Sequence, residues 1–88
     1  MEYLDLRRFV FEHTNKLENK EFILSIKNRD EKFKIKILNN ILYLYDNKNN
    51  LIKEFNLKEY SRSDLGVELR LTILKYLNIE GLITFIIE

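Results

Sequence analysis

Residues 22–57 read FILSIKNRDEKFKIKILNNILYLYDNKNNLIKEFNL, and this stretch decides the fold. Phe22, Leu24 and Ile26 alternate with Ile23, Ser25 and Lys27. Apolar residues alternate with Lys over residues 32–37, and Tyr alternates with Leu over residues 42–45. Period-two alternation is typical of strands that bury one face. Segments rich in Asn and Asp separate these runs, and residues 51–57 supply a fourth one. The pattern predicts a four-stranded antiparallel meander.

Three turns set the expected strand registers. The first is centred on residues 29–30, and the second on residues 39–40, where two Asn tolerate positive φ. The third is centred on residues 48–49 or 49–50, two alternatives that this pattern leaves open. All these registers place the apolar residues of the meander on one face. The expected partners are Ile26–Phe33, Leu24–Ile35 and Phe22–Ile37, then Ile35–Leu44 and Ile37–Leu42, with Phe55 on the face of Leu42 and Leu44.

The segments that flank the meander show helical spacing. Over residues 1–17 apolar positions recur every three or four residues, which predicts a helix. Residues 62–78 fit either a strand or a helix, because their apolar residues satisfy both periods. A cap at Ser61 or Ser63 and a stop at Gly81 favour the helix. Residues 82–87, rich in Ile, predict a short final strand.

The sequence therefore predicts one α+β domain spanning residues 1–88. Its elements are an N-terminal helix, the antiparallel meander, a second helix and a C-terminal strand, with both helices on one face of the sheet. The expected core consists of Leu6, Val10, Phe22, Leu24, Ile26, Phe33, Ile35, Ile37, Leu42, Leu44, Phe55, Leu69, Ile73 and Phe85.

The composition limits the function classes. Lys and Arg number 15 and Asp and Glu number 14, so the 88-residue chain has a net charge of +1. The chain has no Cys, which excludes disulfides, thiolate metal sites and a cysteine nucleophile. No apolar run approaches the ~20 residues of a membrane helix. We expect a cytoplasmic protein without a membrane segment.

Few residues suggest catalysis or metal binding. His13 is the one histidine, and its place on the apolar stripe of the first helix favours a packing role. Residues 46–50 resemble the start of a calcium loop, but Lys48 occupies a ligand position, so a solvated hairpin turn is expected. Residues 61–64 are interpreted as a helix cap. The expectation is a protein that is not an enzyme, with no catalytic residue, metal or cofactor.

The polar face of the meander has the most distinctive composition. It interleaves cations with aromatic rings, a pattern that serves a protein interface or a platform for single-stranded nucleic acid, or that only tolerates solvent. In the expected registers Lys34 faces Ser25 and Tyr45, and Lys36 faces Ile23 and Tyr43. The candidate binding residues are Lys27, Lys32, Lys34, Lys36, Tyr43 and Tyr45.

The leading hypothesis is a small non-catalytic factor that binds a larger host protein as an inhibitor or modulator. Ile, Leu, Lys and Asn dominate while Ala and Pro are absent; this composition indicates an AT-rich genome and favours a phage or mobile element. Single-stranded nucleic-acid binding is the alternative. A final strand without Lys, Arg or Pro also favours a homodimer through Ile83, Phe85 and Ile87, unless that strand is central and buried on both faces.

Overall fold

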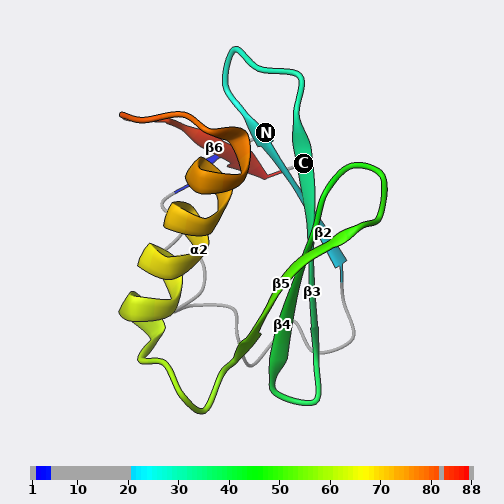
Figure 1. Ribbon diagram of the computed structural model, residues 1–88, viewed down its shortest axis with the longest axis vertical. Coiled ribbons are helices and arrows are strands. Elements are labelled where there is room, and N and C mark those ends of the chain that lie inside the picture. Colours follow the sequence, from blue (N-terminus) through cyan, green and yellow to red (C-terminus); the bar gives the residue numbers. More distant parts are fainter. Residues whose placement is uncertain (1, 5–20, 82, 88) are drawn as a thin grey trace.

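The computed structural model describes residues 2–4, 21–81 and 83–87, which form a six-stranded antiparallel sheet and one helix. The elements are β1 (Glu2–Leu4), β2 (Glu21–Ile26), β3 (Lys32–Leu38), β4 (Ile41–Tyr45), β5 (Leu51–Asn56), α2 (Arg62–Leu77) and β6 (Phe85–Ile87). The strand order is β1-β6-β2-β3-β4-β5. Helix α2 lies against one face of the sheet (Figure 1). The α+β class and the meander β2–β5 are thereby confirmed.

The hairpin β3–β4 has the predicted register. Ile35 pairs with Leu44 and Ile37 with Leu42. The connecting residues Asn39 and Asn40 have φ of 53° and 63°. Two consecutive positive φ values match the right-handed twist of a hairpin, and Asn tolerates them. The two Asn residues therefore fix this register.

The hairpin β2–β3 differs from its predicted register by two residues. Leu24 rather than Ile26 pairs with Phe33. The turn is centred one residue earlier than expected, because Asn28 takes a φ of 67° and the Arg29 N–H donates to the Ile26 carbonyl at 3.1 Å. A shift of two residues leaves every side chain on its original face. The predicted apolar face is therefore correct, even though the predicted cross-strand pairs between β2 and β3 are not.

Most of the hairpin β4–β5 has the register expected for a turn on residues 48–49, with Leu42 opposite Phe55. The register shifts between Leu44 and Tyr45, so that Tyr45 opposes Leu51. The Asp46 N–H donates to the Asn50 carbonyl at 3.0 Å, and the loop itself is therefore centred on Lys48. Phe55 is fully buried on the face of Leu42 and Leu44, as predicted.

Helix α2 confirms the helical interpretation of residues 62–78. The Ser61 hydroxyl accepts a hydrogen bond from the Asp64 N–H at 3.2 Å, which caps the first turn. The helix ends at Asn78 rather than at Gly81. Asn78 has a left-handed conformation with φ of 55°, and its N–H donates to the carbonyls of Leu74 and Lys75. Asn tolerates this conformation nearly as Gly does, so it ends the helix first.

The predicted N-terminal helix is wrong over residues 2–4, which form β1. This strand pairs with β6, with Tyr3 opposite Ile86. An available partner strand outweighs helical spacing over so short a segment, since local propensity yields to tertiary pairing. The rest of that predicted helix, including Leu6, Val10 and His13, lies outside the described residues.

The core lies between α2 and the inner face of the sheet. Among the predicted core residues that the structure describes, all are buried except Phe22, which is partly buried and packs against the others. The structure adds Leu65, Leu74 and Ile86 to the buried set. Within the described ranges no helix is long and apolar enough to cross a membrane.

Candidate interaction surface

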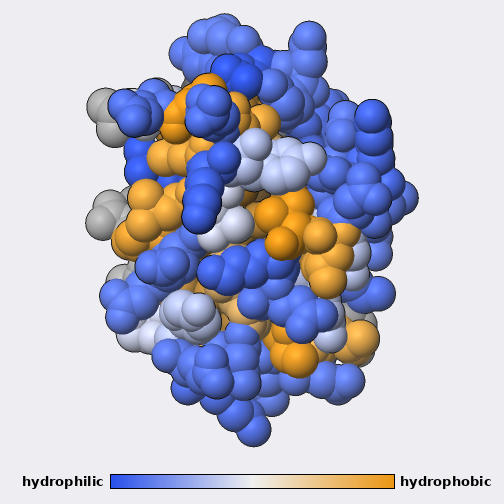
Figure 2. All heavy atoms as spheres, viewed as in Figure 1, coloured by the Kyte–Doolittle hydropathy of each residue, from blue (hydrophilic) through white to orange (hydrophobic). Residues whose placement is uncertain are grey.

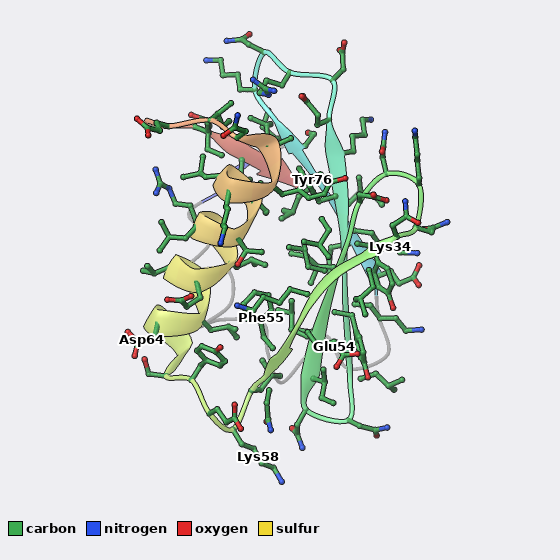
Figure 3. All side chains as sticks on the ribbon, viewed as in Figure 1. Lys34, Glu54, Phe55, Lys58, Asp64 and Tyr76 are labelled. Atoms are coloured by element: carbon green, nitrogen blue, oxygen red, sulfur yellow. The ribbon has the colours of Figure 1, made fainter. Side chains whose placement is uncertain are left out.

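The meander presents a second face, opposite the one that packs against α2. Strand alternation and the observed registers assign residues from four strands to it. Phe55 lies between sheet and helix in Figure 3, whereas Lys34 lies on the far side of the sheet from α2. We call this surface the outer face; its central residues are Glu21, Ile23, Lys34, Lys36, Tyr43, Tyr45 and Glu54, and Ser25, Lys32, Leu38 and Ile41 lie at its ends.

Lys34 lies at the centre of the outer face, where three groups hold its ammonium. The Nζ atom donates to the Asn49 Oδ1 at 2.8 Å. It lies 4.9 Å from the centroid of the Tyr45 ring, within cation–π range. It is also 3.9 Å from the Glu21 Oε1, a loose ion pair. Lys34 therefore occupies a defined position rather than a freely solvated one.

Tyr43 and Tyr45 form a stacked aromatic pair on β4. Their ring centroids are 6.4 Å apart and their planes differ by 24°. Lys36 pairs with Tyr43, and Lys34 pairs with Tyr45, as the sequence predicts. Both rings are half-buried. They provide a partly exposed aromatic surface.

Carboxylates on the outer face are a feature that the sequence-based registers missed. Because the β2–β3 register is shifted, Lys36 faces Glu21 instead of Ile23, and Lys34 faces Ile23 instead of Ser25. Glu54 of β5 lies opposite Tyr43. Asn28 is the sequence signal that could have indicated this register, because Asn tolerates the positive φ that it adopts here. The face therefore has mixed charge rather than a basic stripe.

The two remaining candidate cations lie at the margin of this surface. Lys32 begins β3 opposite Ser25 and is exposed. Lys27 is exposed in the turn after β2, where its backbone N–H donates to the Thr84 carbonyl at 2.9 Å. The structure thus brings four of the six predicted residues together and leaves these two beside them.

The final strand β6 is not an edge strand. It pairs with β1 on one side and β2 on the other. Its successive residues Phe85 and Ile86 point to opposite faces, and both are buried. Ile83 packs against the core, and Ile87 pairs with Leu24. The premise of an unprotected edge is wrong, and the alternative of a central strand buried on both faces fits.

Asp46 organises the β4–β5 turn. Its carboxylate accepts hydrogen bonds from the backbone N–H groups of Asn50 and Lys48 at 2.9 and 2.8 Å. It also accepts from the Asn50 side-chain amide at 3.1 Å and the Tyr76 hydroxyl at 3.0 Å. The segment is a hairpin turn as predicted, but Asp46 is only 7% exposed and is not solvated. The Asp46 oxygens thus accept hydrogen bonds from its own turn and from α2, in line with the expectation of a hairpin turn rather than a calcium loop.

These hydrogen bonds shift two titrations. The backbone N–H of Asn50, with further help from Lys48, the Asn50 amide and Tyr76, lowers the pKa of Asp46 to about 2. The bond to Asp46 raises the pKa of the Tyr76 hydroxyl. Tyr76 reaches from α2 to the sheet (Figure 3). Its ring contacts the Phe33 ring edge-on, with the two ring centroids 5.8 Å apart. The turn is thereby linked to the C-terminal end of the helix.

A pocket of about 300 Å³ opens between the outer face and this turn. It shares Ile23 and Lys34 with the outer face. Its lining is mostly apolar, with cations and amides among its polar groups. The lining residues are Ile23, Lys32, Phe33, Lys34, Asp46, Asn47 and Asn49.

Apolar side chains also reach the surface of α2. Val67 and Leu71 are 40% and 47% exposed, one helical turn apart. Figure 2 shows hydrophobic residues among hydrophilic ones over this side of the molecule. The helix surface is thus a second apolar region, and a test of the outer face must discriminate between the two.

Comparison of the chain with family models, with curated proteins and with solved structures found no significant match. Among the described residues, His, Cys, Asp and Glu do not gather in any group of three or more that could hold a metal ion. His13, the other candidate considered from the sequence, lies outside the described residues.

Proposed function

We propose that this chain is a small non-catalytic protein-binding factor, and that the outer face of its sheet is the contact surface. The observation that carries the proposal is the stacked pair Tyr43–Tyr45, half-buried and surrounded by charges of both signs. Tyr adds contact area at a low cost in conformational entropy and is enriched at protein interfaces. The pair is held in place before binding, which reduces the entropy lost in the complex.

The charge pattern favours a protein over a nucleic acid. Glu21 lies opposite Lys36 and Glu54 lies opposite Tyr43, so two carboxylates share this face with the lysines and repel phosphates. A base that stacks on Tyr45 must also compete with the Lys34 ammonium already over that ring. A protein partner, in contrast, can present charges of both signs opposite a mixed surface.

The proposal extends to the setting. The partner is a larger host protein in the cytoplasm, which the chain inhibits or modulates as a factor of a phage or mobile element. The dominance of Ile, Leu, Lys and Asn and the absence of Ala and Pro support this setting. Self-association is a further, separate proposal, and sedimentation of the wild type as a monomer would contradict it.

A position-specific cross-link tests the contact surface. The photoreactive residue p-benzoylphenylalanine replaces Tyr43 in one variant and Leu71 of α2 in another, and each is irradiated in a lysate of the source organism. The proposal expects one discrete protein adduct from position 43, competed away by excess unlabelled wild type. Position 71, equally apolar but on the opposite side of the sheet, should give no competed adduct.

Two results would contradict the proposal. The first is the absence of a competed adduct at position 43, or equal adducts at both positions. The second is tight binding of a fluorescent single-stranded oligonucleotide that weakens with salt and is lost in Tyr43→Ala, which would establish the nucleic-acid alternative. Oligonucleotide binding without a salt slope would exclude that alternative.

A further inference from the structure

The pocket beside the outer face has the size of a side-chain site. Its volume of about 300 Å³ lies at the lower end of the range for small-molecule pockets, roughly 300–1,000 Å³. The half-exposed side chain of Ile23, 36% accessible, contributes an apolar wall. A space of this size and polarity can accept an apolar side chain of a partner segment together with a neighbouring part of that segment.

The charged groups of the pocket are arranged asymmetrically. Lys32 and Lys34 line it from alternate positions on one face of β3. Among the described residues that line it, the one acid is Asp46, whose carboxylate accepts four hydrogen bonds from the turn and from Tyr76. The Glu21 carboxylate stays 3.9 Å from the Lys34 Nζ, too far for a hydrogen bond. The pocket therefore offers positioned positive charge beside an apolar space.

We propose that this pocket anchors an acidic–apolar segment of the protein partner. One apolar side chain fills the space against Ile23, and an adjacent carboxylate accepts a hydrogen bond from the Lys34 ammonium and displaces the loose Glu21 contact. The amides of Asn47 and Asn49 lie at the same rim and can pair with the backbone of the segment. This inference rests on the proposed function, because the pocket and the outer face share Ile23 and Lys34.

An NMR titration with short peptide probes tests the ligand class. Acetyl-Asp-Leu-Glu-Leu-amide carries both features of the proposed segment, acetyl-Lys-Leu-Lys-Leu-amide reverses the charge, and acetyl-Asp-Ser-Glu-Ser-amide removes the apolar groups. Only the first peptide should give saturable shifts of the backbone amides of Ile23, Lys34, Asn47 and Asn49. Loss of one exposed charge contact in Lys34→Gln should weaken this binding about fivefold.

Matched variants make the result specific to the pocket. Ile23→Ser should weaken the binding as well, whereas Lys53→Gln, which removes the same charge from β5 outside the pocket, should leave it unchanged. The inference is overturned if the first peptide gives no saturable shifts, if the serine peptide binds equally well, or if Lys53→Gln weakens binding as much as Lys34→Gln. Stronger shifts of the same amides by an oligothymidylate would also overturn it, since they would assign the pocket to phosphate.

The two proposals fail in different ways. If position 43 gives a competed cross-link but no peptide gives saturable NMR shifts, the protein-binding function is supported and the acidic–apolar ligand class is wrong. Peptide shifts confined to the pocket without any competed cross-link support the ligand class and remove the outer face as the contact surface.

Discussion

The two faces of β3 and β4 are made of alternating residues of the same short segment, yet they are held in different ways. On the inner face Ile35, Ile37, Leu42 and Leu44 are at most 2% exposed and pack in the core. On the outer face the alternate residues are half-buried and contact one another through specific pairs, such as the Lys34 ammonium over the Tyr45 ring.

This difference separates stability from recognition. Burial of apolar area contributes strongly to the free energy of folding and depends little on the exact shapes of the side chains. The inner face therefore stabilises the fold. The outer-face contacts are charge-assisted or aromatic and lie near water, where each contributes little to stability. They fix the positions of side chains that a partner can meet, and their loss should affect binding more than folding.

The largest effect is expected from truncation of the inner face. Ile35→Ala removes a fully buried side chain packed between Phe22 and Leu44, and it should lower the free energy of unfolding by about 2–5 kcal/mol. Tyr43→Ala on the outer face should cost clearly less, because its ring is half-exposed. Urea denaturation of both variants measures the difference. Equal losses would contradict the distinction between the faces.

Much of the inner face is predictable from the sequence because strand period is a local property. The alternation around Ile35 and Leu44 assigns the face, and the two Asn at positions 39 and 40 assign the register. The β2–β3 register was not predictable in the same way, because several polar residues can centre that loop. The pairing of residues 2–4 with β6 depends on residues more than eighty positions apart, which no local pattern reports.

The second prediction concerns the turn that joins the faces to α2. Asp46→Asn removes a carboxylate that accepts four hydrogen bonds, so stability at neutral pH should fall, by less than in Ile35→Ala. The folded-state pKa of Asp46, about 2, lies below its ordinary value of 3.8. The wild type should therefore lose this stabilisation as the pH falls from about 4 to about 2, and the variant should lack that part of the acid dependence.

The control for Asp46 is Asp30→Asn, which removes the same charge from an exposed position in the β2–β3 loop. Thermal unfolding followed by circular dichroism over this pH range compares the two variants. A steep acid dependence retained in Asp46→Asn, equal to that of the wild type, would show that other carboxylates govern acid stability.

The third prediction tests how the β3–β4 register is set. Asn40 has a φ of 63°, and Ala in that left-handed conformation costs about 1–2 kcal/mol. Asn40→Ala should lower the free energy of unfolding by about this amount, whereas Asn40→Gly should retain stability because Gly accepts positive φ. Urea denaturation provides the measurement. An unchanged Asn40→Ala would mean that the pairing of the inner faces alone sets the register.

The candidate surface was predictable only in part. A register shift of two residues leaves every side chain on its original face. The sequence could therefore place four of the candidate residues on one face: Lys34, Lys36, Tyr43 and Tyr45. Their neighbours were not predictable, because Glu21 reaches Lys36 only in the observed register. The pocket depends on Asp46, whose hydrogen bond to Tyr76 joins residues thirty positions apart. Side-chain contacts of this kind follow from the packing of α2 and not from local periodicity.

The smallest effect on stability is expected from Lys34→Gln, the variant that sharpens the contrast most. In the wild type the Lys34 ammonium makes a hydrogen bond to Asn49, a loose ion pair with Glu21 and a contact with the Tyr45 ring, all on a solvent-accessible face. Contacts of this kind contribute little individually, so the free energy of unfolding should fall by less than about 1 kcal/mol. The matched control is Lys53→Gln. In the wild type the Lys53 ammonium lies 5.1 Å from the centroid of the Phe55 ring, and its loss should cause a similarly small change in the free energy of unfolding. Urea denaturation at low and high salt separates the ionic part, which salt screens, from the hydrogen bond to Asn49. A loss in Lys34→Gln as large as that of Ile35→Ala would mean that the outer face also stabilises the fold, and the division of roles between the two faces would then be wrong.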